Sequence, residues 1–69
     1  MTVYLNMRSS YGVETVDEFS SEEFQEWNSK SEKPYKSFLA YVRAMISEYH
    51  LSGMNVYRSQ RCTKDWRDR

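Results

Sequence analysis

Alternation of apolar and polar side chains marks the start of the chain as a β-strand. Across residues 2–9, every second side chain is apolar, at Val3, Leu5 and Met7. A period of two places these three on one face of a strand. The side chains between them fall on the opposite face, and these are Tyr4, Asn6 and Arg8.

A turn and a second strand follow the first. Residues 9–12 read Ser-Ser-Tyr-Gly, which is typical of a hairpin turn with a glycine that tolerates a positive φ. The return strand, residues 13–18, is irregular because Val13 and Val16 are three positions apart and cannot share a face of an undistorted strand. We expect a β-bulge or an edge position there, and the pattern leaves the register open.

Two signals then predict a short helix over residues 21–27. Ser20 and Glu23 fit a capping box, and Phe19 and Phe24 fit the hydrophobic staple that accompanies it. The glutamates of the first turn suit the positive end of the helix dipole. We expect this helix to rest its aromatic side chains against the core.

The longest predicted element is an amphipathic helix over residues 34–53. Pro34 suits a first helical turn, and Gly53 can adopt the left-handed conformation that ends a helix. The apolar side chains recur at steps of three and four, which is the spacing of one helical face. They are Phe38, Leu39, Val42, Met45, Ile46 and Tyr49.

Residues 55–61 predict a last strand. If the long helix runs back along the hairpin, this strand lies antiparallel to the first strand and beside it. The predicted fold is therefore α+β, in the order β-β-α-α-β, with a three-stranded antiparallel sheet of order 2-1-3 packed on one main helix. We expect one domain over residues 1–62 and a charged tail over residues 63–69, with Trp66 as its single apolar anchor.

Length and charge narrow the class of protein. With 69 residues the chain forms one small domain with little room for a catalytic cleft. Ten basic and ten acidic side chains cancel, so no net field favours nucleic acid or membrane, although acidic residues dominate before residue 34 and basic ones after residue 53. A single cysteine, no signal segment and no long apolar run lead us to expect a cytoplasmic protein without a membrane partner.

Catalytic and metal chemistry find little support in the sequence. His50 is the only histidine and Cys62 the only cysteine, so no cluster of zinc ligands can form from them. Neither lies in a sequence context that signals an activated nucleophile. We expect a structural role for both, no cofactor and no enzymatic activity.

An acidic stretch is the first candidate binding surface. It runs without a basic residue from Glu14 to Trp27. One interpretation is a solvated strand edge and helix face. The other is a surface whose carboxylates take the place of phosphates in the basic groove of a nucleic-acid enzyme. The residues of this protein-binding prediction are Glu14, Asp17, Glu18, Glu22, Glu23 and Glu26.

The sheet face away from the long helix is the second candidate. Tyrosine and arginine side chains gather there, a combination that suits base stacking with phosphate neutralisation and equally suits a protein interface. A third interpretation has the tail folded over this face, with Trp66 on Tyr57. The residues of the nucleic-acid prediction are Tyr4, Arg8, Tyr57, Arg58, Arg61 and Lys64.

Three stretches carry a resemblance: V-Y-L-N at residues 3–6, V-E-T-V-D-E-F at residues 13–19, and G-M-N-V-Y-R-S-Q-R-C-T-K-D-W at residues 53–66. They resemble stretches in short uncharacterised proteins of phages and mobile elements of low-GC Gram-positive bacteria. The resemblance covers about half the chain and transfers no functional residue. It implies a context in which very short proteins bind and inhibit host factors, including CRISPR nucleases and restriction enzymes.

The leading hypothesis is therefore a non-enzymatic protein-binding module of a phage or mobile element. Its most specific form is an inhibitor of a bacterial defence nuclease, of the anti-CRISPR or anti-restriction type, that acts through the acidic stretch. The alternative is a small RNA- or DNA-binding module that uses the tyrosine and arginine face. A homodimer joined through the open sheet face is compatible with either hypothesis.

Overall fold

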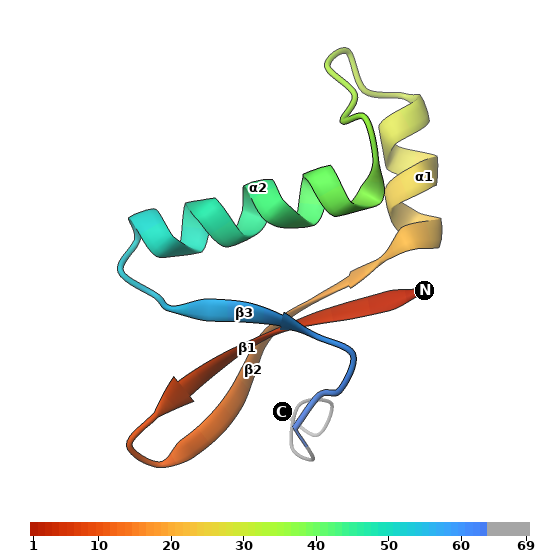
Figure 1. Cartoon of the computed structure of the whole chain (residues 1–69). Coiled ribbons are helices and arrows are strands. Elements are labelled where there is room, and N and C mark those ends of the chain that lie inside the picture. The colour runs from red at the N-terminus through yellow and green to blue at the C-terminus, as the bar shows by residue number, and fades with distance from the viewer. Residues whose placement is uncertain (64–69) are drawn as a thin grey trace.

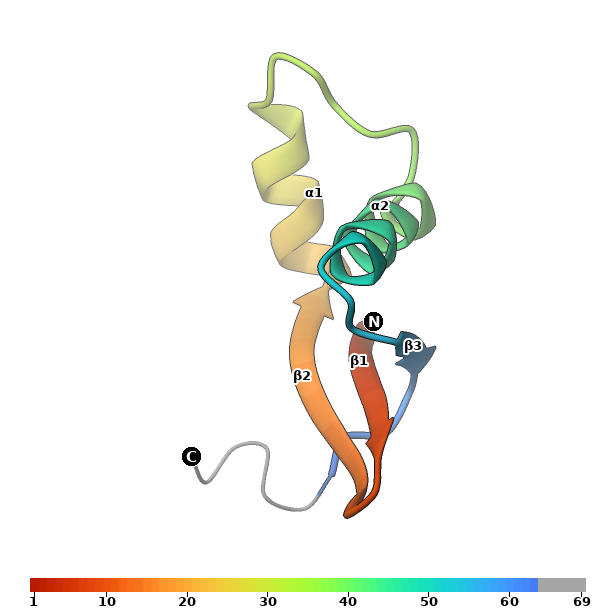
Figure 2. The ribbon, with the colours of Figure 1, turned by 90° about the vertical axis from the view of Figure 1, so that its left-hand side faces the viewer.

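The computed structural model describes residues 1–63 of the chain. Its elements are β1 Thr2–Ser9, β2 Gly12–Ser20, α1 Ser21–Ser29, α2 Phe38–Leu51 and β3 Val56–Ser59. The strands form one antiparallel sheet in the order β2-β1-β3, which confirms the predicted α+β class and topology. Both helices lie near one end of the sheet, and the β1–β2 turn points away from them (Figures 1 and 2).

The main apolar core lies between the sheet and α2. Val3 and Leu5 of β1, Val42 of α2 and Val56 of β3 are 0–4% exposed and pack together. We call these four residues the aliphatic core. The alternation of β1 and the three-and-four spacing of α2 bring their apolar faces together as predicted. Partly buried side chains, among them Met7, Val16 and Ile46, surround it.

A β-bulge resolves the register of β2. Leu5 pairs with Asp17 and Asn6 pairs with Thr15, so Val16 is an extra residue without a partner on β1. The bulge directs Val16 toward the aliphatic core, whereas Val13 remains 46% exposed. Both predicted remedies are present, because β2 is also an edge strand of the sheet.

The long helix begins later than predicted. Ser37 is its N-cap, and the Ser37 hydroxyl accepts a hydrogen bond from the backbone N–H of Ala40 at 3.1 Å. Pro34 therefore lies in the preceding loop, where the Asn28 side chain exchanges two hydrogen bonds with the backbone of Tyr35. A good serine cap outweighed the proline signal. The predicted C-terminal glycine is confirmed, since Gly53 has a φ of 87°.

Residues 61–63 cross the sheet face opposite α2. The Asn6 amide donates to the Arg61 carbonyl at 3.0 Å, and the Thr15 hydroxyl donates to Asn6 Oδ1 at 2.6 Å. The Thr63 N–H completes this Asn6–Thr15 network by donating to the Thr15 hydroxyl at 2.9 Å. Asn6 and Thr15 are buried. The centre of this face is therefore covered by residues 61–63 and not open, in the direction of the interpretation that placed the tail over it.

Other boundaries differ slightly from the prediction. α1 extends two residues beyond residue 27, and β3 is shorter than the predicted range 55–61. Lys64, Trp66 and the rest of the predicted tail from residue 64 lie outside the described residues. Within residues 1–63, neither helix has the length and apolar character needed to span a membrane.

Candidate protein-binding site

A pocket of about 320 Å³ opens where the end of β2 meets α1 and the start of α2. It combines aromatic rings with two carboxylates, and we call it the acidic–aromatic pocket. β2 contributes its last three residues, α1 contributes its first two turns, and α2 contributes one tyrosine. The lining residues are Glu18, Phe19, Ser20, Glu23, Phe24, Trp27 and Tyr41.

The local sequence shapes this pocket by joining β2 to α1 without a loop. Ser20 is the last residue of β2 and also the N-cap of α1, and its hydroxyl accepts from the Glu23 N–H at 3.4 Å. The chain direction therefore changes abruptly between Phe19 and Phe24. Both rings contact Tyr41 of α2, with centroids at 5.4 Å and 5.1 Å. The two residues of the predicted hydrophobic staple, Phe19 and Phe24, therefore both pack against Tyr41.

Tyr41 lies at the centre of a cluster of six rings that come from the end of β2, from α1, from the following loop and from α2. Its ring centroid is 5.8 Å from that of Trp27 and 5.3 Å from that of Tyr35. Trp27 is nevertheless 50% exposed, so the cluster opens to solvent on the α1 side. Burial, together with the negative charge of Asp17, raises the pKa of Tyr41 above its ordinary value. The aromatic cluster comprises Phe19, Phe24, Trp27, Tyr35, Phe38 and Tyr41.

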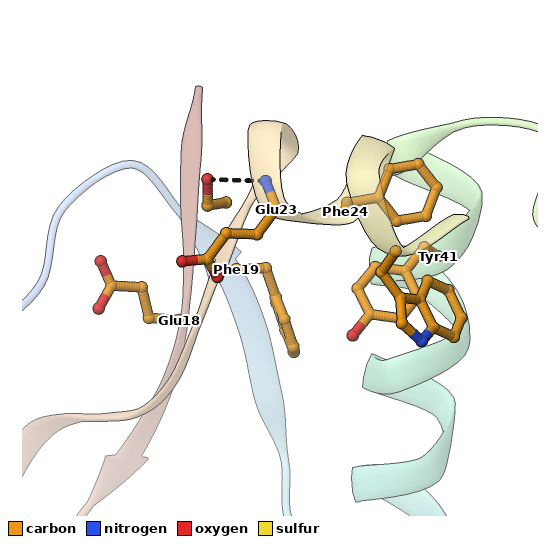
Figure 3. A pocket seen from close by; sticks show the side chains of 7 residues that line it. Glu18, Phe19, Glu23, Phe24 and Tyr41 are labelled. Atoms are coloured by element: carbon orange, nitrogen blue, oxygen red, sulfur yellow. Dashed lines mark hydrogen bonds between the residues drawn. The ribbon is translucent and has the colours of Figure 1, made fainter. Parts of the chain in front are cut away.

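The two carboxylates of the pocket lie on the side opposite the Phe24 and Tyr41 rings. Figure 3 shows Glu18 and Glu23 on the sheet side and the Phe24 and Tyr41 rings on the α2 side, with Phe19 between them. Glu23 is exposed, and Glu18 is partly buried. Negative charge and ring faces thus border the same space.

Two of the six predicted acidic residues make specific contacts elsewhere. Glu22 accepts a hydrogen bond from the amino group of Met1 at 2.8 Å and another from the Ser20 hydroxyl at 2.9 Å. The bond from the amino group is the main reason why the pKa of Glu22 is lowered to about 2. Asp17 accepts a hydrogen bond from the Tyr49 hydroxyl of α2 at 2.7 Å, which places it on the helix side of the sheet.

The remaining two acidic residues, Glu14 and Glu26, lie apart from each other and from the pocket. Glu14 is partly buried and pairs with Met7 near the hairpin turn, and Glu26 is exposed on α1. The acidic stretch is therefore not one continuous surface. The structure brings Glu18 and Glu23 together at one pocket and distributes the other four along β2 and α1.

The predicted nucleic-acid residues are also divided between two faces. Tyr4 and Tyr57 lie on the face opposite α2, and the Arg8 guanidinium carbon is 5.7 Å from the centroid of the Tyr57 ring. Arg58 pairs with Leu5 and lines a different pocket beside Leu39 of α2, so it belongs to the helix side.

Arg61 is exposed, and its carbonyl accepts the hydrogen bond from Asn6 that anchors the C-terminal segment. Lys64 lies outside the described residues. Of the six predicted nucleic-acid residues, Tyr4, Arg8 and Tyr57 therefore share one face of the sheet.

His50 and Cys62 are the two side chains that were considered for metal binding or catalysis. His50 Nε2 is 3.1 Å from the Val56 carbonyl and helps to hold the α2–β3 connection. Cys62 is a free, exposed thiol. Within residues 1–63, no group of three or more histidine, cysteine or carboxylate side chains is placed to hold a metal ion.

The role of Tyr41 was not predicted from the sequence, and Trp27 was expected to rest against the core without a statement of how much of it stays exposed. Tyr41 is three positions after Phe38 and four before Met45, so helical spacing places it beside the predicted apolar face. That signal was present in the sequence. The partial exposure of Trp27 depends on how steeply α1 crosses α2, and no local pattern encodes that angle (Figure 1).

Comparison with protein-family models, with curated proteins and with solved structures finds no match to this chain. The function is therefore inferred from the geometry and the chemistry of the acidic–aromatic pocket.

Proposed function

We propose that this domain is a non-enzymatic protein-binding module whose partner presents basic side chains. The observation that carries the proposal is the acidic–aromatic pocket, where Glu18 and Glu23 border a half-exposed Trp27. Exposed tryptophan and tyrosine rings supply much of the binding energy at protein interfaces. Carboxylates beside them favour a positively charged partner and speed the encounter with it.

The narrower proposal names the partner as a bacterial defence nuclease of the CRISPR or restriction type, inhibited in the cytoplasm. Such enzymes hold nucleic acid in basic grooves that bind largely through phosphate charge, and carboxylates can occupy the same positions. Glu23 and Glu26 are exposed on α1, and Glu18 adds a third carboxylate at the end of β2. The choice of a nuclease rests on the resemblance to phage and mobile-element proteins.

An inhibition assay tests both levels of this proposal. DNA cleavage by purified CRISPR and restriction nucleases is measured with increasing amounts of the protein, and binding is measured in parallel by calorimetry. We expect inhibition of at least one nuclease. The variant Glu22→Lys/Glu23→Lys/Glu26→Lys should abolish it, whereas Glu32→Lys, in an exposed loop, should not.

Two results of that assay would contradict the proposal at different levels. Uninhibited cleavage by every nuclease tested, together with an absence of binding, rejects the nuclease as the partner. Full binding by the charge-reversed variant rejects the acidic surface as the contact. Because Glu22 also contacts the Met1 amino group, Glu23→Lys/Glu26→Lys serves as a second variant that leaves this contact intact.

A nucleic-acid-binding module is the second candidate, favoured by Tyr4, Arg8 and Tyr57 on one sheet face. The Arg8 guanidinium already lies over the Tyr57 ring, which leaves less of that ring for base stacking. Residues 61–63 also occupy the centre of the face. Titration with single- and double-stranded oligonucleotides across salt concentrations decides the matter, because phosphate binding weakens steeply with salt.

The proposed homodimer through the same sheet face has its own test. Residues 61–63 cover the centre of that face, so a partner copy would contact the margin that includes Tyr57, which is 37% exposed. Sedimentation at several concentrations reports the association. A strictly monomeric result rejects the dimer.

A further inference from the structure

The acidic–aromatic pocket has walls of two kinds. Phe19, Trp27 and Tyr41 supply ring surface, and Glu18 and Glu23 supply negative charge on the other side (Figure 3). The face of an aromatic ring carries partial negative charge, so rings and carboxylates attract the same kind of ligand. That ligand is an organic cation.

Other ligand classes fit these walls less well. An anion would meet two carboxylates, and a purely apolar group would displace water from the Glu23 carboxylate without giving it a hydrogen bond in return. A calcium ion takes six to eight oxygen ligands, and magnesium demands near-ideal octahedral geometry. Ring faces supply no such ligands. The pocket is thus suited to a cation that also presents carbon surface.

Among the cationic side chains of proteins, arginine suits this site better than lysine. Its guanidinium group is planar, stacks on aromatic faces and donates paired hydrogen bonds to carboxylates. A lysine ammonium is compact and more strongly hydrated, so it gains less from flat rings. The half-exposed ring of Trp27 provides a surface for stacking, and the exposed carboxylate of Glu23 provides an acceptor for the paired hydrogen bonds.

We propose that the acidic–aromatic pocket receives an arginine side chain of a partner protein, with the guanidinium stacked on the aromatic wall and hydrogen-bonded to Glu23. This inference rests on the proposed function and deepens it. Under this inference the partner is recognised by one arginine side chain in the pocket, and not only by the overall negative charge of the surface. Glu26, exposed on the same helix but absent from the pocket lining, then contributes only to the general field.

The test is a titration of the isotopically labelled protein with N-acetyl-L-arginine methylamide, followed by NMR chemical shifts. We expect saturable shifts at the Trp27 indole N–H and at the backbone of Phe19, Glu23 and Tyr41. The citrulline analogue has nearly the same shape without the charge, and it should bind at least roughly fivefold more weakly. The lysine analogue should fall between the two.

Two matched variants locate the binding determinants. Glu23→Gln should weaken binding of the arginine probe roughly threefold to fivefold, while Glu26→Gln should change it less than about 1.5-fold. Trp27→Leu keeps an apolar side chain and removes the ring face, and it should weaken binding about threefold. Thermal unfolding of each variant shows that the fold is retained.

Several results would overturn the inference. These are equal binding of the citrulline analogue, shifts that map away from the pocket, an equal loss in Glu26→Gln, or binding of the lysine analogue as tight as that of arginine. An absence of saturable shifts also overturns it, and the proposed function survives if charge reversal still abolishes partner binding. If the arginine probe binds as expected but charge reversal leaves partner binding intact, the proposed function is the part that fails.

Discussion

Two apolar regions of this small domain differ in how completely they are closed. The aliphatic core is 0–4% exposed and lies between a sheet and a helix whose sequence patterns match. The aromatic cluster lies between two helices and the loop that joins them, and it leaves Trp27 half exposed. Closed packing of small branched side chains fixes the fold. Open packing of large rings leaves surface on which another molecule can bind.

The two regions meet at Asp17. Its carboxylate accepts the hydrogen bond from Tyr49 beside the aliphatic core, and its charge also raises the pKa of Tyr41 in the aromatic cluster. The contrast between the regions leads to four predictions about stability, given in decreasing order of effect.

The largest effect is expected in the aliphatic core. Leu5 is 0% exposed, so Leu5→Ala should lower the free energy of unfolding by about 3 kcal/mol through lost burial and the cavity left behind. Leu51→Ala removes the same atoms from an 88% exposed position and should cost less than about 0.5 kcal/mol. Urea denaturation followed by circular dichroism measures both. Equal losses would contradict the description of a closed core.

The next effect is expected in the Asn6–Thr15 network behind β1. Thr15→Val keeps the shape of the side chain and removes the hydroxyl that bonds to Asn6 and to the Thr63 N–H. Leaving these buried groups unpaired should cost about 2 kcal/mol. Thr15→Ser retains the hydroxyl, and denaturation midpoints should show it to be the more stable variant. A Thr15→Val protein as stable as the parent would mean that the network adds nothing to the closed region.

A smaller effect is expected in the aromatic cluster. Trp27→Ala should lower the free energy of unfolding by about 1 kcal/mol, because half of the side chain is already in water. Trp27→Phe should lose less. Thermal denaturation measures the change, and a loss as large as that of Leu5→Ala would show that the cluster is part of the closed core after all.

The smallest effect is expected at Tyr49, and it is lost at high pH. The pKa of Tyr49 is raised to about 12, because its hydroxyl donates to Asp17 and because burial disfavours the charged form. The unfolded chain releases this proton near the ordinary value of 10, so the contribution is complete below that pH and is lost as the pH rises through 12.

Urea denaturation at several values between pH 9 and pH 12 tests this linkage. The stability difference between the parent and Tyr49→Phe should shrink as the pH rises. Tyr11→Phe, at a 99% exposed position, should keep a constant difference from the parent. A Tyr49→Phe difference that does not change with pH would show that the Asp17 bond is not maintained in solution.

The two regions also differ in how far the sequence predicts them. Alternation in β1 and helical spacing in α2 determine the aliphatic core. Each period specifies one apolar face, and these two apolar faces bury each other. Ser20 likewise marked the start of α1 from its own neighbourhood. Long-range polar contacts carry no such period. The bond from Asn6 to Arg61 joins residues 55 positions apart, and the sequence near either residue does not predict it.

The candidate site was predicted only in part for the same reason. The sequence shows the acidic stretch directly, as acidic residues uninterrupted by basic ones. How these residues are divided between two faces depends on the bulge at Val16 and on the cap at Ser20. The two glutamates that share the pocket are five positions apart, on a strand and on a helix. Their proximity follows from the abrupt join between β2 and α1.

The C-terminal crossing over β1 has a consequence for synthesis on the ribosome. β1 is the central strand, yet it pairs with β3, and its Asn6 side chain bonds to the Arg61 carbonyl, so two of its contacts are with segments translated about 50 residues later. The β1–β2 hairpin consists of neighbouring residues and can form early, whereas contacts between distant segments form slowly. The nascent chain must therefore keep one edge of β1 unpaired until Val56–Ser59 have emerged. During that interval the strand is open to mispairing or to a chaperone.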